Sequence, residues 1–149
     1  MIREKLLKEL RLLKGQKLQR INLACQMIVL NFGEHGIHLQ SFTRIIKNND
    51  ILLTTLDYQS WDQNISTNND QWFYFEKFKN EIINGIVIDI KLSKTNDLLI
   101  ELNNSIIIET YISNGYNYYE EEQEQWRLLT NINNDGKHFV VYNKHIECE

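Results

Sequence analysis

The feature that most constrains the fold is a motif that occurs twice along the chain. Residues Phe42–Leu53 read FTRIIKNNDILL, and residues Gln125–Val141 read QWRLLTNINNDGKHFVV. In both copies an arginine is followed by two aliphatic residues, a polar linker with Asn-Asn-Asp, and an apolar run. Asn and Asp side chains bond to their own backbone and tolerate left-handed conformations, which favours turns. Each copy therefore predicts a β-hairpin with an arginine, Arg44 or Arg127, in its first strand.

The repeat extends toward the N-terminal side of both hairpins, because a shift of 70 residues lays Gly15 on Gly85. Each glycine follows a segment whose apolar residues recur at helical spacing. These apolar stripes are Ile2, Leu6, Leu10 and Leu13 in the first segment, and Trp72, Phe75, Phe78 and Ile82 in the second. Gly15 is expected to close the first helix, and Asn69 or Asp70 to cap the second at its N-terminus.

These observations predict an α+β fold of two diverged helix-plus-antiparallel-β-meander units, related by a pseudo-twofold duplication and sharing one core. We expect a single domain over residues 1–149, with internal units at about 1–58 and 70–145 and a polar connecting loop at 59–69. At this length the chain can bury a substantial core. The alternative is that two unrelated hairpin units rich in Asn and Ile resemble each other by composition.

Charge and hydropathy exclude some classes of protein. The formal net charge is −4 and charged residues make up 24% of the chain, without the concentrated basic face of a nucleic-acid binder. No apolar run approaches the length of a membrane span, so we expect a cytoplasmic protein that binds neither nucleic acid nor membrane. Cys25 and Cys148 lack metal-site spacing, and no metal or cofactor is predicted. Cys25 is expected to be a small core residue in a strand, and Cys148 to be exposed.

Several polar residues are candidates for a site. Residues Ile37–Ile46 are predicted as one long strand, which would place His38, Gln40 and Arg44 on the same face. The full candidate cluster is His38, Gln40, Arg44, Asp57, Glu124, Trp126, Arg127 and His138. Two interpretations stay open. The cluster is either a buried network that fixes the fold, or a site where arginines and histidines bind an anion or a carboxylate. Catalytic motifs are absent from the sequence, and no catalytic residue is predicted.

A second candidate is the insertion at residues 113–123, which replaces the short connection of the first unit. It contains tyrosines and an acidic run on an otherwise economical scaffold. Loops of this kind often carry binding residues. The candidate partner-binding residues are Tyr116, Tyr118, Tyr119, Glu120, Glu121 and Glu122. The alternative is an ordinary solvated loop.

Several short stretches carry a resemblance to a known family. They are Ile37-His38-Leu39-Gln40, Phe42-Thr43-Arg44-Ile45, Asp57, Glu124-Gln125-Trp126-Arg127-Leu128 and His138-Phe139-Val140-Val141. Over roughly residues 15–142 the chain resembles a family of small bacterial proteins of uncharacterised activity. The family pattern is H-x-Q-x-x-[aromatic]-R-[aliphatic], then G-x-x-D, E-x-W-R-L and H-[aliphatic]-V-V. Thr43 stands where that family has an aromatic residue, and Thr54-Thr55-Leu56-Asp57 lacks the glycine.

Members of that family resemble immunity-type proteins, which bind and neutralise a toxin domain. The resemblance therefore implies a non-catalytic protein that occludes a protein partner. One alternative is a ligand-binding or enzymatic site around His38, Arg44, Arg127 and His138. A further one is a peptide or RNA binder, because a helix, a glycine and a series of bent strands also resemble the outline of Sm-like and SH3-like small barrels.

Overall fold

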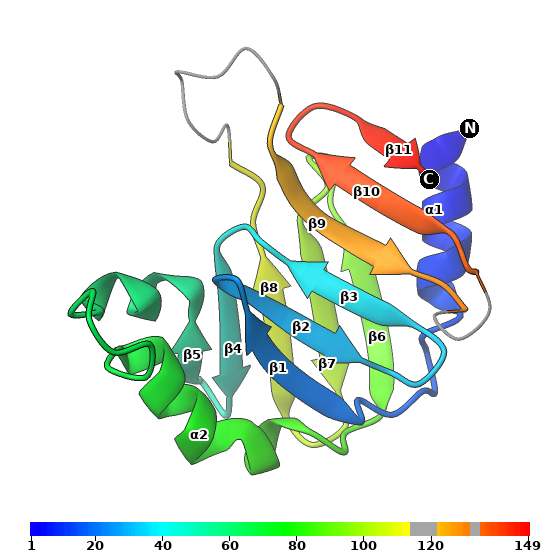
Figure 1. The fold of residues 1–149 in the computed structure, drawn as a ribbon. Helices are drawn as coiled ribbons and strands as arrows, with labels where there is room; N and C mark the ends of the chain where they lie inside the picture. The colour runs from blue at the N-terminus through cyan, green and yellow to red at the C-terminus, as the bar shows by residue number, and fades with distance from the viewer. Residues whose placement is uncertain (114–121, 132–134) are drawn as a thin grey trace.

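The structure is a computed structural model of Met1–Glu149 that describes residues 1–113, 122–131 and 135–149 (Figure 1). Its helices are α1 (Ile2–Arg11), the 3-10 helix η1 (Thr55–Ser60) and α2 (Asp70–Ile82). Its strands, in chain order, are β1 (Arg20–Ala24), β2 (Met27–Asn31), β3 (Gly36–Leu39), β4 (Thr43–Lys47), β5 (Asp50–Thr54), β6 (Val87–Leu92), β7 (Leu98–Leu102), β8 (Ile106–Thr110), β9 (Glu124–Leu129), β10 (His138–Tyr142) and β11 (Ile146–Cys148).

The strands form two antiparallel sheets. One has six strands in the order β1-β2-β3-β9-β10-β11, and the other has five in the order β5-β4-β8-β7-β6. The six-stranded sheet joins a three-stranded meander from each half of the chain through the β3–β9 pairing. The five-stranded sheet joins the β4–β5 hairpin of the first half to the β6–β8 meander of the second half through the β4–β8 pairing. The predicted α+β class with antiparallel sheets is confirmed. Two separate sheets differ from the single barrel that the small-barrel resemblance implies.

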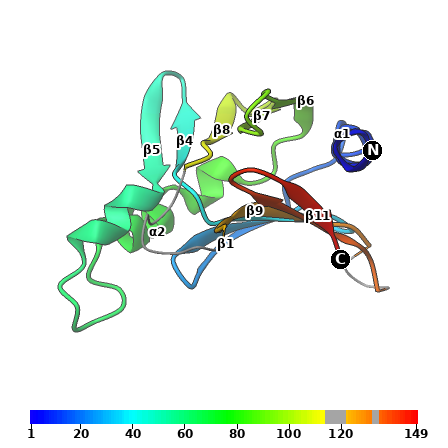
Figure 2. The same cartoon turned by 90° about the horizontal axis from the view of Figure 1, so that it is seen from above.

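The two sheets face each other, and the helices lie at the two ends of the space between them (Figure 2). Helix α1 packs beside β6 and β11, and α2 packs beside β5 and β1. The outer face of the six-stranded sheet is turned toward the viewer in Figure 1, and neither described helix lies over it. No described helix therefore shields that face, and its exposed side chains are accessible to a partner or ligand.

The core lies between the sheets and follows strand alternation. Ile37 and Leu39 of β3 and Leu128 of β9 are fully buried, and intervening residues such as His38 and Arg127 point outward. Burying one isoleucine or leucine side chain stabilises a fold by about 1.5–3 kcal/mol. In α1 the predicted stripe is buried at Leu6, Leu10 and Leu13. In α2 Phe75 and Ile82 are buried, Phe78 is partly buried and Trp72 is 37% exposed.

Of the two predicted helix-end residues, Asn69 caps its helix and Gly15 has a different role. Asn69 caps α2, because its side-chain oxygen accepts the N–H of Trp72 at 2.7 Å, as predicted. Helix α1 ends at Arg11, and Gly15 follows one turn later with φ +87°. The Gly15 N–H donates to the carbonyl oxygen of Val87 at 2.9 Å, so this glycine connects the end of α1 to β6 instead of capping the helix itself.

The predicted Asn-Asn turn of the first hairpin is confirmed. Asn48 and Asn49 have φ values of 50° and 68°, the conformation that a two-residue hairpin requires. Cys25 and Gln26 make a turn of the same type between β1 and β2, with φ values of 50° and 65°. The prediction that Cys25 is a core residue is therefore wrong, because a side chain at a hairpin tip is exposed. Cys148 is exposed as predicted, and both thiols are free.

The predicted single strand Ile37–Ile46 is also wrong. Strand β3 ends at Leu39 in the six-stranded sheet, and β4 begins at Thr43 in the five-stranded sheet. At the bend, the N–H groups of Gln40 and Ser41 both donate to the carbonyl oxygen of Gln125 at 2.9 Å. The bend takes the chain from one sheet to the other and keeps residues such as Leu39 and Ile45 in the shared core.

Candidate functional site

A polar cluster lies on the outer face of the six-stranded sheet. The β3–β9 register places His38 directly opposite Arg127. Both residues alternate with buried neighbours on their strands, so their side chains stand on the open face. His138, at the start of β10, lies within hydrogen-bond reach of Arg127. Five of the eight predicted residues meet on this face, and they are His38, Gln40, Glu124, Arg127 and His138.

Arg127 is the centre of this cluster. Its Nε donates to Glu124 Oε1 at 3.0 Å, and its Nη1 lies 2.9 Å from Nδ1 of His138. The side-chain amide of Gln40 donates to the second carboxylate oxygen of Glu124. Only 23% of the Arg127 side chain and 15% of the Glu124 side chain are exposed. The guanidinium and the carboxylate are thus largely occupied by each other, which favours a structural ion pair over a group waiting for an anion.

The two charges set the protonation of their neighbours. Burial lowers the pKa of His38 below its ordinary value of 6.5, and the positive charge of Arg127 lowers it further. The hydrogen bond to Glu124 raises the pKa of Arg127, which is therefore permanently charged. His38 is then a neutral imidazole beside a fixed cation at neutral pH.

Carboxylates continue from this cluster toward the C-terminal strand. We call Glu122, Glu124, Glu147 and Glu149, together with Arg127 and His145, the acidic strip. Arg127 contacts Glu124 and also Glu149, the latter at 3.8 Å. His145 contacts Glu122 and Glu147, the latter at 3.0 Å. One arginine and one histidine therefore link four carboxylates, which leaves the strip negatively charged.

His145 holds the far end of the acidic strip. Its ring stacks on Tyr142 with centroids 4.6 Å apart. The hydrogen bond with Glu147 raises the pKa of His145 above 6.5, and the contact with Glu122 adds to the rise. The sequence analysis did not identify Tyr142, His145, Glu147 or Glu149. They come together because β11 pairs with β10. A strand of only three residues has too short a pattern for this pairing to be predicted from the sequence.

Three predicted site residues lie elsewhere, which corrects the expectation of one shared face. Arg44 stands on the outer face of the five-stranded sheet, where its Nη2 lies 2.7 Å from Glu109 Oε2. Asp57 accepts the Thr54 N–H at 2.9 Å at the start of η1. Trp126 is fully buried on the inner side of β9. The chain bend after β3 is the physical reason that Arg44 is separated from His38 and Gln40.

Arg44, Glu109 and Tyr111 form a second, smaller polar cluster, of which only Arg44 was predicted. Glu109 also accepts the Tyr111 hydroxyl at 2.7 Å, and neither residue was singled out in the sequence. Burial works to raise the pKa of Glu109, but hydrogen bonds from Tyr111 and Arg44 outweigh it and the pKa lies below its usual value. The signal that could have identified Glu109 is its place opposite Arg44, which requires knowing that β4 pairs with β8.

The predicted partner-binding loop is described only at its end. Tyr116, Tyr118, Tyr119, Glu120 and Glu121 lie outside the described residues. Glu122 is described, and it belongs to the acidic strip through its contact with His145. The loop leads directly into β9 at Glu124. The two candidate regions of the sequence are therefore continuous in the chain.

Across residues 1–113, 122–131 and 135–149, no three His, Cys, Asp or Glu side chains are grouped so that they could hold a metal ion. In the same part of the chain, none of the helices is long and apolar enough to cross a bilayer. No protein-family model, curated protein or solved structure matches this chain.

Proposed function

We propose that this is a non-catalytic binding protein that occludes a protein partner, in the manner of an immunity protein on a toxin domain. The contact surface is the acidic strip together with the loop that precedes it. The observation that carries the proposal is the excess of carboxylates on an uncovered sheet face, where Arg127 and His145 hold Glu122, Glu124, Glu147 and Glu149 in place.

The charge of the strip supports a basic partner. Glu147 and Glu149 are about half exposed at 51% and 53% of their side chains, so their charges reach solvent. Complementary charge speeds encounter and rejects partners of the wrong sign. Toxin domains that act on nucleic acid carry basic surfaces, because they must bind phosphates. A negatively charged strip is the complement of such a surface.

The fixed geometry of the strip also supports binding over catalysis. Arg127, Glu124, Gln40 and His138 are hydrogen-bonded to one another, so the face is preorganised before a partner arrives. Preorganised side chains lose little conformational entropy on binding, which favours affinity. The same bonds engage the groups that would have to act on a substrate.

We also propose that the two halves arose by the duplication that the sequence repeat suggests. The first half contributes the meander β1–β3 to one sheet and the hairpin β4–β5 to the other, and the second half contributes the meander β6–β8 and the hairpin β9–β10, which β11 extends by a third strand. Arg44 opposite Glu109 then corresponds to Arg127 opposite His38. The halves meet at an antiparallel bridge between Lys17 and Ile86, close to the glycines that the repeat superposes.

The proposed function is tested by affinity capture from the native cells with charge variants. The double variant Glu147→Gln, Glu149→Gln removes two exposed carboxylates of the strip. The control variant Glu4→Gln, Glu34→Gln removes two exposed carboxylates elsewhere. We expect the native protein and the control to capture a stoichiometric basic partner, identified by mass spectrometry, and the strip variant to capture much less. Equal capture by all three proteins, or no stoichiometric partner, would contradict the proposal.

A further inference from the structure

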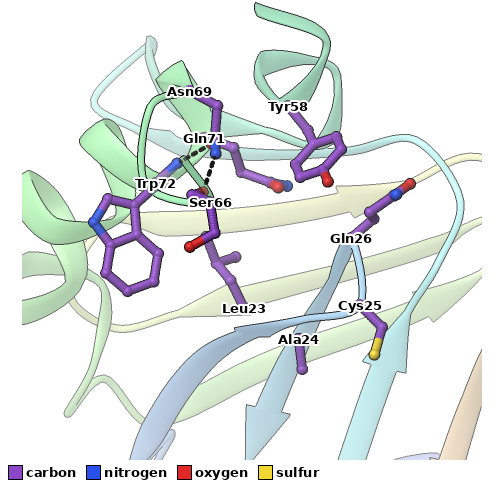
Figure 3. Close-up of a pocket in the computed structure, with 9 residues that line it drawn as sticks. All are labelled: Leu23, Ala24, Cys25, Gln26, Tyr58, Ser66, Asn69, Gln71 and Trp72. Atoms are coloured by element: carbon purple, nitrogen blue, oxygen red, sulfur yellow. Dashed lines mark hydrogen bonds between the residues drawn. The ribbon is translucent and has the colours of Figure 1, made fainter. Parts of the chain in front are cut away.

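A hollow of about 280 Å³ opens at the N-terminal end of α2 (Figure 3). Four segments form its wall: the turn between β1 and β2, η1, the loop that follows η1, and the first turn of α2. It lies at the opposite end of the six-stranded sheet from β10 and β11 (Figure 1). The hollow is therefore separate from the acidic strip, and its role does not depend on the proposed function.

The walls of the hollow are fixed by hydrogen bonds. The Asn69 side chain accepts the Trp72 N–H and donates to the carbonyl oxygen of Ser66, both at 2.7 Å. The hydroxyl of Ser60 accepts the Asp70 N–H at 2.8 Å, which joins η1 to α2. These bonds hold the loop and the helix end in one arrangement, so the hollow is preformed.

Gln71 is the exception among these polar groups. Its residue surface is only 2% exposed, and its Nε2 has no hydrogen-bond acceptor among the described residues. Figure 3 shows the amide extending from α2 toward Tyr58 and Gln26, into the hollow that all three line. A buried N–H donor without a partner costs about 1–3 kcal/mol. A ligand that offers an acceptor at this place recovers that cost.

The chemistry of the lining selects the class of ligand. None of the nine lining residues is an acid, a lysine or an arginine, so a charged ligand would lose hydration without gaining a counter-ion. The Gln71 amide offers a donor and an acceptor side by side, which matches an amide in the ligand. Tyr58, Trp72 and Leu23 supply aromatic and apolar surface that a planar ligand can contact.

We propose that this hollow binds a neutral, compact group with an adjacent N–H donor and carbonyl acceptor, paired with the side-chain amide of Gln71. Two sources carry that chemistry: a free planar amide or cyclic imide, and a glutamine or asparagine side chain on a polypeptide. Both place a carbonyl oxygen where Gln71 Nε2 can donate to it.

The test is an NMR titration of the full chain that follows the side-chain NH₂ signals of Gln71 and the indole N–H of Trp72. The probes are benzamide, uracil and N-acetylglutamine amide, with benzoate as a charged control of the same shape as benzamide. We expect at least one neutral amide to shift both signals in a saturable way, and benzoate to leave them in place. Saturation with benzamide or uracil assigns a free small molecule, and saturation with N-acetylglutamine amide alone assigns a polypeptide side chain.

The matched variants are Gln71→Met, which keeps the length of the side chain and removes the amide, and Gln59→Met on the exposed side of η1. We expect Gln71→Met to weaken binding of the neutral probe about tenfold or more, and Gln59→Met to bind as the native protein does. The melting temperature of Gln71→Met should be unchanged or higher, because the unpaired donor is gone. The proposal is overturned if no neutral probe shifts the Gln71 signals up to its solubility limit, or if Gln71→Met binds the probe equally well.

Discussion

The two arginines of the repeated hairpins have the same place in the sequence motif and different surroundings in the structure. Arg44 pairs across strands with Glu109, and 35% and 19% of the two side chains are exposed. Arg127 faces His38 across strands and takes its carboxylate, Glu124, from its own strand. The Arg44 pair is a simple surface ion pair with a tyrosine beside it. The Arg127 group is a more buried network that includes histidines.

This difference shows which part of the repeated motif has a structural role and which part is a candidate for function. An arginine at a fixed place in a hairpin stabilises the pairing of two strands in both sheets, so the motif itself carries no evidence of a site. What differs is the charge that surrounds each arginine. Arg127 is joined to the acidic strip, whereas Arg44 has one carboxylate, Glu109, and the hydroxyl of Tyr111 nearby. The Arg127 side is therefore the better candidate for a partner surface.

The largest expected effect concerns binding on the Arg127 side. Replacing Tyr116 and Tyr118 by Ser and Glu120–Glu122 by Gln should abolish partner binding and leave the melting temperature nearly unchanged. A Glu109→Gln variant on the Arg44 side is the control, and it should bind the partner normally. Isothermal titration with the captured partner measures both. Native affinity in the loop variant would remove the loop from the proposed surface.

The next effect concerns stability. Arg127→Ala leaves the largely buried carboxylate of Glu124 without its cation, and it should lower the free energy of unfolding by about 2 kcal/mol. Arg44→Ala should cost less, because the Arg44 pair is more open to solvent. Urea denaturation of both variants gives the comparison. The double variant Arg127→Ala, Glu124→Gln should recover part of the loss, and equal losses for the two arginines would refute the distinction.

The smallest effect is the pH dependence that two histidines give to the Arg127 side. In NMR titrations His38 should titrate below 6.5, because burial and Arg127 lower its pKa, and His145 above 6.5, because Glu147 and Glu122 raise its pKa. Since the folded pKa of His38 is lowered, its contribution to stability is present above about pH 6.5 and is lost as the pH falls to the folded pKa.

The pH dependence of stability that His145 contributes has the opposite sign. Its contribution is present below about pH 6.5 and is lost as the pH rises through its raised folded pKa. His38→Gln and His145→Gln should each remove one of the two slopes. The reverse order of the two titration midpoints would contradict the geometry described for Arg127 and Glu147.

Local chemistry in the sequence predicted local structure well. The Asn48-Asn49 turn, the Asn69 cap and the buried stripe of α1 follow from side chains that act on their own backbone or on one face of a helix. Gln40, Glu124 and Arg127 were predicted as members of one larger cluster, and they are hydrogen-bonded in the structure.

Pairing between distant strands could not be predicted in the same way. Period-two alternation gives the two faces of a strand but does not say in which sheet the strand lies, so the break between Leu39 and Thr43 was missed. In β6 a bulge between Val87 and Asp89 interrupts the alternation: Val87 is buried and Ile88 is 54% exposed. The burial of Gln71 was not predicted, because a polar residue beside the apolar stripe of a helix is normally exposed to solvent.

The exchange of strands between the two halves has a consequence for how the chain reaches its native state. Gly36–Leu39 can pair with β2 early, but its other edge stays unpaired until Trp126–Leu129 has been made, because β9 lies in the opposite half. During synthesis on the ribosome, the N-terminal half therefore has neither sheet complete and carries unpaired strand edges. Contacts of such long sequence separation predict slow folding. Two fragments divided within residues 59–69 should each stay unstructured alone and assemble when mixed, which makes this connection a natural place to split the protein into a complementation pair.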